Sequence, residues 1–171
     1  MKKRARTKQR GMTLIETLIG FLILFFVLIS VLQIFSMAYA VNMGSAARTD
    51  LTYRAQRVAE VIRTIYAFER TETATFDALK ASSGVDLENQ VGTEPVTVSL
   101  PPSGKEAFWG SGWANVVEPD APFELSYEVT AGTTGGARFT VTVTAQPKTT
   151  GKKYPGLAGV GKAVRYAATI Q

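Results

Sequence analysis

The longest apolar stretch of the chain lies near its N-terminus, from Leu18 to Val41. It holds 24 residues without a charge and is interrupted only by single glycine, serine and glutamine residues. As an α-helix this stretch is about 36 Å long, whereas the hydrocarbon core of a bilayer is roughly 30 Å thick. The pattern therefore predicts a helix that crosses a membrane once.

A second pattern follows this stretch directly. Apolar residues recur at spacings of four, three, four and three, which places them on one side of a helix. This stripe consists of Leu51, Ala55, Val58, Ile62 and Ile65. No proline occurs between Met1 and Glu94, so nothing forces the helix to end early. We expect one nearly continuous helix from Met12 to about Phe68, apolar all round in its first half and amphipathic in its second.

The last fifty residues contain segments in which apolar and polar side chains alternate, which is typical of half-buried β-strands. Three segments show this pattern, at 123–130, 138–145 and 164–170. The glycine-rich segment 132–136 predicts a hairpin loop between the first two. A fourth strand is expected over 96–100, because Val96, Val98 and Leu100 alternate before a pair of prolines.

A small antiparallel sheet with one apolar face needs a cover, and the amphipathic half of the helix supplies one. The sequence thus predicts an α+β fold, in which a long N-terminal helix is transmembrane in its first half and packs against the sheet with its second. The stretch Glu69–Pro122 is the least regular. Within it we expect a short helix over Thr75–Ser82 and a loop over Phe108–Pro122.

The net charge of +5 arises from the first ten residues. Six of the 19 basic residues lie there, so the rest of the chain carries 13 positive against 14 negative charges. These six residues are Lys2, Lys3, Arg4, Arg6, Lys8 and Arg10. Because short basic flanks stay in the cytoplasm, we expect a cytoplasmic N-terminus and an exported chain after Val41. The near-neutral remainder gives no support for nucleic-acid binding.

The composition also bears on chemistry. The chain has no cysteine and no histidine, so the usual zinc ligands and the usual nucleophile–base pairs are missing. With no converging set of carboxylates, an enzyme is the least favoured class of protein, and no cofactor or metal is expected. Glu118 and Asp120 lie close in the sequence, but two carboxylates are too few for calcium, which takes 6–8 oxygen ligands.

Two groups of residues in the C-terminal part invite a functional interpretation. We interpret Trp109 and Trp113 as residues that pin a loop onto the sheet rather than as a contact surface, because aromatic side chains are more often buried. Lys148, Lys152 and Lys153 form a small basic loop. We interpret it as a solvated loop rather than a DNA-binding surface, because it lacks aromatic interleaving.

Glu16 is the residue that fits the apolar helix least, since Leu14, Ile15, Leu18 and Ile19 surround it. In a simple membrane anchor it would be a tolerated charge that reaches headgroup water. A secretory signal is a second alternative, because residues 38–40 read Ala-Tyr-Ala. The apolar stretch is longer than the roughly 7–15 residues of a signal, and neither alternative explains why a carboxylate stands at this place.

The segment RGMTLIETLIGF, Arg10 to Phe21, resembles the prepilin leader and cleavage motif of type IV pilins and pseudopilins. That motif has a short basic leader, a glycine, an apolar residue, Ser or Thr, two apolar residues, a glutamate and then a long apolar helix. Met12 stands where phenylalanine is most usual in the family. The resemblance covers about thirty residues, and it implies the same long helix with a small α+β head.

The resemblance implies that a prepilin peptidase cuts between Gly11 and Met12 on the cytoplasmic side and methylates the new amine of Met12. Residues 1–11 are then a leader that is removed. Residues 12–45 form the transmembrane and filament-core helix, and residues 46–171 form the soluble head. The implied partners are the peptidase, other pilin or pseudopilin subunits and an inner-membrane assembly platform.

The same resemblance implies that Glu16 serves filament assembly, by pairing with the Met12 amine of an adjacent subunit. The expected location is the inner membrane before assembly and the pilus after it. The irregular stretch 69–122 and the lack of a repeat favour a minor subunit. Motility, adhesion, DNA-uptake and type II secretion filaments share the motif, so it does not choose among them. The alternative is a bitopic membrane protein whose periplasmic head binds a ligand and never polymerises.

Overall fold

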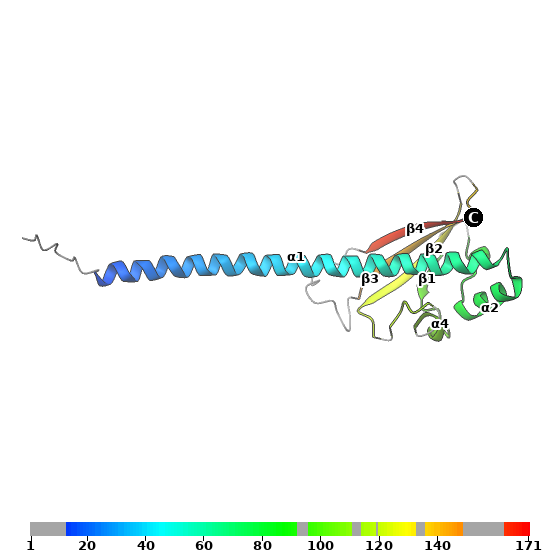
Figure 1. Ribbon diagram of the computed structural model, residues 1–171, viewed down its shortest axis with the longest axis horizontal. Helices are drawn as coiled ribbons and strands as arrows, with labels where there is room; N and C mark the ends of the chain where they lie inside the picture. Colours follow the sequence, from blue (N-terminus) through cyan, green and yellow to red (C-terminus); the bar gives the residue numbers. More distant parts are fainter. Residues whose placement is uncertain (1–12, 92–95, 111–113, 119, 133–135, 149–162) are drawn as a thin grey trace, which may run out of the picture. The chain divides into compact units, whose positions relative to one another are not determined.

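The computed structural model describes residues 13–91, 96–110, 114–118, 120–132, 136–148 and 163–171. It is an α+β structure with a long N-terminal helix and a four-stranded antiparallel sheet, which confirms the predicted fold class (Figure 1). The elements are α1 (Leu14–Phe68), α2 (Thr73–Ser83), α3 (Leu87–Gln90), β1 (Thr97–Leu100), α4 (Glu106–Gly110), β2 (Phe123–Ala131), β3 (Phe139–Pro147) and β4 (Val164–Ile170).

The chain divides into two compact units, Met1–Val41 and Asn42–Gln171. Within the part described, the first unit holds only the N-terminal half of α1. The second unit holds the rest of α1 and all the other elements. Helix α1 ends at Phe68, as the hydrophobic pattern predicted, and it continues through Gly44 without a break.

The sheet is a simple antiparallel meander in the order β1-β2-β3-β4. Strand β3 pairs with β2 from Ala131↔Phe139 to Phe123↔Pro147. All three predicted alternating segments are strands, and along each of them the apolar side chains are the more buried set. The predicted fourth strand is β1, which begins at Thr97 and not at Val96.

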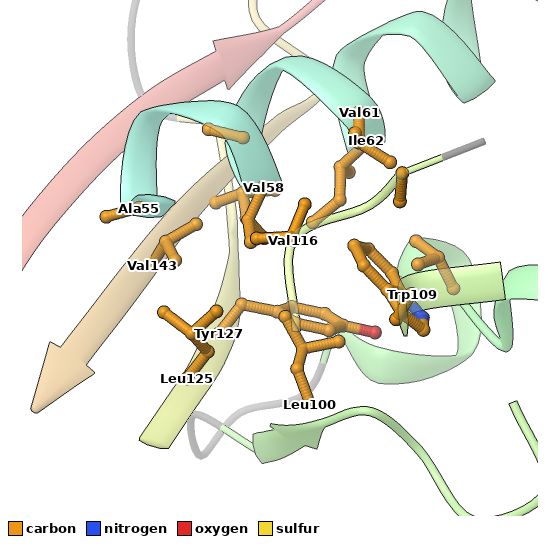
Figure 2. Packing of buried hydrophobic residues seen from close by; sticks show 14 of the residues in the cluster. Ala55, Val58, Val61, Ile62, Leu100, Trp109, Val116, Leu125, Tyr127 and Val143 are labelled. Carbon is orange, nitrogen blue, oxygen red and sulfur yellow. The ribbon is translucent and has the colours of Figure 1, made fainter. Parts of the chain in front are cut away.

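The apolar stripe of α1 covers the inner face of this sheet. All five predicted stripe residues are buried in one cluster with the inward-facing residues of the strands. Figure 2 shows Ala55, Val58 and Ile62 of α1 turned toward Tyr127 of β2 and Val143 of β3. The hydrophobic effect of this burial is what holds helix and sheet together, because the chain has no cysteine for a disulfide.

The irregular stretch after α1 forms short elements that close one side of the same core. The predicted helix over 75–82 is α2, which is longer by a few residues. It ends at Gly84, whose φ of 72° lies in the left-handed region that favours glycine. An added Cβ there would also lie 3.3 Å from the side chain of Lys105.

The interpretation of Phe108–Pro122 as a loop was wrong at its start, because Phe108 to Gly110 belong to α4. Trp109 of this helix is fully buried, and its indole N–H donates to the carbonyl of Ser83 at 2.9 Å. Trp109 thus belongs to the core, as predicted (Figure 2). Trp113 lies outside the described residues.

Arg54 joins α1 to the segment that precedes β2. Its guanidinium contacts Asp50 at 3.2 Å and Glu118 at 3.3 Å, and donates to the carbonyl of Val116 at 2.9 Å. Burial by itself lowers the pKa of Arg54, but the two carboxylates outweigh it and leave that pKa raised. Glu118 thus forms an ion pair with Arg54.

Candidate functional site

The first turn of α1 contains Glu16, the residue that the sequence singled out. Helix α1 begins at Leu14, and the backbone N–H groups of Glu16 and Thr17 donate to the carbonyl of Thr13 at 3.0 and 3.2 Å. A carboxylate is favourable at this end because the first turn of a helix carries a partial positive charge. The local structure therefore accommodates Glu16 without strain.

The side chains around Glu16 are apolar and exposed. Leu14 is 83% exposed and Phe21 is 70% exposed, and every described residue from Thr13 to Asn42 is classed as exposed. Soluble monomers rarely show contiguous apolar surfaces of this kind, because water disfavours them. This part of α1 is thus built to be covered by lipid or by other helices.

Two hydroxyl groups within this apolar part donate to the backbone of the helix itself. The Thr17 hydroxyl donates to the carbonyl of Leu14 at 2.7 Å, and the Ser30 hydroxyl donates to that of Phe26 at 2.9 Å. In an apolar environment a polar side chain must find its hydrogen-bond partner within the protein, because water is absent. For the carboxylate of Glu16, no ion pair to another residue exists in the part of the chain that the structure describes.

One helix of the described chain, α1, is long and apolar enough to cross a membrane, by length and composition only. Gly11 and Met12 lie outside the described residues. Their relation to Glu16 comes from the sequence, in which Met12 precedes Glu16 by four residues, about one helical turn. The structure therefore describes Glu16, the predicted assembly residue, whereas the predicted cleavage residues Gly11 and Met12 rest on the sequence alone.

The other candidate residues do not converge on a second site. Trp109 lies in the core and Glu118 pairs with Arg54. The backbone N–H of Lys148 donates to the carbonyl of Pro122 at 2.9 Å; Lys152 and Lys153 fall outside the description. Among the described residues, no group of three or more acidic side chains lies close enough to hold a metal ion.

Sequence reasoning missed the contacts of Arg54. Arg54 and Glu118 are 64 positions apart, and no periodic pattern links them. The available signal was the place of Arg54 beside Ala55, a residue of the apolar stripe. A charged side chain at the margin of a buried stripe needs a partner. For Arg54, partners come from the segment before β2, namely Val116 and Glu118.

Residues 6–32 match the family model described as a prokaryotic N-terminal methylation motif. No curated protein and no solved structure gives a significant match to the chain. The matched segment contains Gly11, Met12 and Glu16, and it runs into the exposed apolar part of α1. The chain thus carries, on a pilin-like α+β fold, the N-terminal methylation motif that is typical of type IV pilins and pseudopilins.

Proposed function

We propose that the chain is a structural subunit of a type IV pilus or a related pseudopilus, assembled through its N-terminal helix. The observation that carries the proposal is the single carboxylate of Glu16 in the first turn of α1, whose part up to Asn42 is otherwise uncharged and exposed throughout. Such a helix can be anchored in lipid before assembly and buried among other helices after it. The matched motif supports the same reading.

Processing would take place at the cytoplasmic face of the membrane. A prepilin peptidase cuts between Gly11 and Met12, removes residues 1–11 and methylates the Met12 amine. Glycine suits the position before the cut because a backbone without a side chain can approach catalytic groups closely. The products are the leader, residues 1–11, and the mature chain, in which residues 12–45 form the anchoring helix and residues 46–171 form a head that lies outside the cytoplasm.

The experiment that tests this proposal is intact-mass analysis of the chain from its native host. We expect the mass of residues 12–171 with one added methyl group on Met12. A Gly11→Leu variant should accumulate at full length in the membrane. A native chain that keeps residues 1–11 would contradict the proposal and favour a bitopic binding protein that does not polymerise.

We propose that the chain is a minor subunit, present in few copies in each filament. The described part of the stretch 69–122, whose irregularity suggested this role, forms three short helices and an edge strand that pack on the core. Such an elaboration of the head suits a subunit with a special place in the filament. Mass fractions in sheared filaments test this point, and a chain that dominates their mass would contradict it.

The proposed partners follow from the same helix. The peptidase and an inner-membrane assembly platform act on the anchored chain, and other pilin or pseudopilin subunits cover its apolar surface in the filament. A deletion strain scored for twitching, transformation and secretion would show which of these filaments contains the chain.

A further inference from the structure

An open cavity of about 620 Å3 lies on the surface of the unit Asn42–Gln171. Its floor is apolar, and three glutamates and one lysine stand around it. We call it the acid-rimmed cavity, and the residues used below are Leu100, Ala107, Phe123, Glu106, Glu118 and Glu124. The single lysine is Lys148, so carboxylates are in excess. A cavity of this size and composition suits an apolar side chain that is followed by a positive charge.

The same unit exposes a patch of that chemistry. Tyr53 is 66% exposed, and only Val96 joins it as an exposed large apolar residue among the described residues of this unit. Arg57 lies one helical turn after Tyr53, with a side chain that is 45% exposed. Its contact with Glu60 at 3.9 Å is a solvent-exposed ion pair of little worth. Tyr53 and Arg57 form what we call the aromatic–basic patch.

The cavity and the patch lie at the same level of α1. Arg54, the residue after Tyr53, contacts Glu118 at 3.3 Å, and its guanidinium lies 4.3 Å from the centre of the Phe123 ring. Glu118 and Phe123 both line the acid-rimmed cavity. Two parallel copies placed side by side, without a shift along α1, can thus bring the patch of one copy to the cavity of the other.

We propose that the acid-rimmed cavity binds the aromatic–basic patch of a second copy of this chain in the same membrane. Tyr53 would cover the apolar floor, and Arg57 would meet Glu106 and Glu124. Membrane anchoring gives both copies one orientation and a high effective concentration, so a weak contact suffices. The contact joins two different patches, which leaves each copy a patch or a cavity for a further neighbour.

This inference rests on the membrane-anchored part of the proposed function and not on filament assembly. The test uses the full chain in membranes and exploits the absence of native cysteine. Chains with Thr49→Cys, one turn before Tyr53, and chains with Ala107→Cys, at the cavity, carry different epitope tags and are expressed together. A short bis-maleimide should yield mixed dimers that carry both tags.

The matched control replaces Ala107→Cys by Thr169→Cys, an exposed position on the outward face of β4. Mixed dimers between positions 49 and 107 should clearly exceed those between 49 and 169. Equal yields of the two pairs would overturn the inference. Expression in a host without pilus assembly proteins keeps the chains in the membrane, so this result does not depend on whether the chain enters a filament, which sheared filaments from the native host report separately.

Charge reversal makes the test specific to the two patches. Arg57→Glu alone or Glu124→Lys alone should reduce the 49–107 crosslink about two- to fivefold, the range of a solvent-exposed ion pair. The double variant should restore it. Arg165→Glu, a reversal at an exposed position on the outward face of β4, should leave the yield unchanged. Failure of the double variant to restore the crosslink would overturn the pairing.

Discussion

Glu16 is the one charged residue between Gly11 and Arg48. In an apolar environment an unpaired ion costs several kcal/mol, and a complementary charge recovers much of it. Processing at Gly11 would create such a charge, the amine of Met12, one helical turn before Glu16. The two groups are complementary, and in a filament each amine would have the Glu16 of a neighbouring subunit within its reach.

Replacement of Glu16 by glutamine or alanine should therefore affect assembly and not insertion. We expect the variants to reach the membrane and lose residues 1–11, while their recovery in sheared filaments falls at least about tenfold, which corresponds to about 1.4 kcal/mol per subunit. Glu16→Asp should retain part of the recovery. The measurement compares processed chain in membranes with chain in filaments.

Thr17→Ala serves as the neighbouring control, because it removes one hydroxyl from the same turn and keeps the charge. It should assemble normally. Normal recovery of Glu16→Ala in filaments would show that the carboxylate is merely tolerated in the membrane helix.

Tyr127 illustrates a buried polar group within the core. Its hydroxyl donates to the side-chain oxygen of Gln90 at 2.9 Å, and burial raises its pKa to about 12. In the unfolded chain the tyrosine ionises near pH 10, so above that pH the unfolded state gains stability that the folded state lacks. The free energy of unfolding should thus fall as the pH rises from about 10 to 12.

Tyr127→Phe should change this pH dependence. At pH 7 the variant loses one hydrogen bond, which costs about 1 kcal/mol. Between pH 10 and 12 its free energy of unfolding should fall less steeply than that of the unchanged chain. Urea unfolding at several pH values provides the measurement, and parallel curves for the two chains would contradict the assignment.

At the scale of elements, periodicity predicted α1 and the four strands, because apolar residues recur at a regular spacing along each of them. Helices α3 and α4 escaped, since four and five residues hold about one helical turn and show no period. Asp86 caps α3 by accepting from the backbone N–H of Asn89. A single capping residue can be recognised as such only once the start of the helix is known.

Of the candidate functional residues, only those that belong to a local sequence pattern could be predicted from the sequence. Glu16 could be identified because a fixed spacing of residue types surrounds it. The acid-rimmed cavity could not, because Leu100, Glu106 and Phe123 come from β1, α4 and β2 and meet only in the folded unit. Long-range contacts of this kind leave no periodic trace in the chain.

The stripe of α1 makes a prediction at this scale. Ile62→Ala removes a fully buried side chain and should lower the free energy of unfolding by about 2–5 kcal/mol. Thr64→Ala, on the exposed side of the same helix, should change it by less than about 0.5 kcal/mol. Urea unfolding in detergent, followed by tryptophan fluorescence, measures both. Equal effects would contradict the packing of the stripe on the sheet.

At the scale of the whole molecule, the second unit contains a complete core. The buried cluster begins at Leu51 and includes residues of all four strands, β1 to β4. A unit that buries its own apolar residues should not need the anchor for folding. The apolar surface that favours association belongs mainly to residues before Asn42.

A fragment that starts at Ala46 should therefore be soluble and monomeric. We expect circular dichroism of a mixed helix and strand content and a single cooperative thermal transition. Size-exclusion chromatography and a melting curve provide the measurement. Aggregation, or a spectrum without strand signal, would show that the sheet depends on the anchored helix.

The order of elements along the chain has a consequence for biosynthesis. The stripe of α1 ends at Ile65, whereas the sheet that covers it begins at Thr97 and is completed by β4 at Val164–Ile170. Because chains emerge from the ribosome N-terminus first, the stripe emerges before the strands that will bury it. Until β4 has been synthesised, the apolar stripe of each new chain lacks its complete cover. A holding chaperone would bind the exposed stripe during this interval.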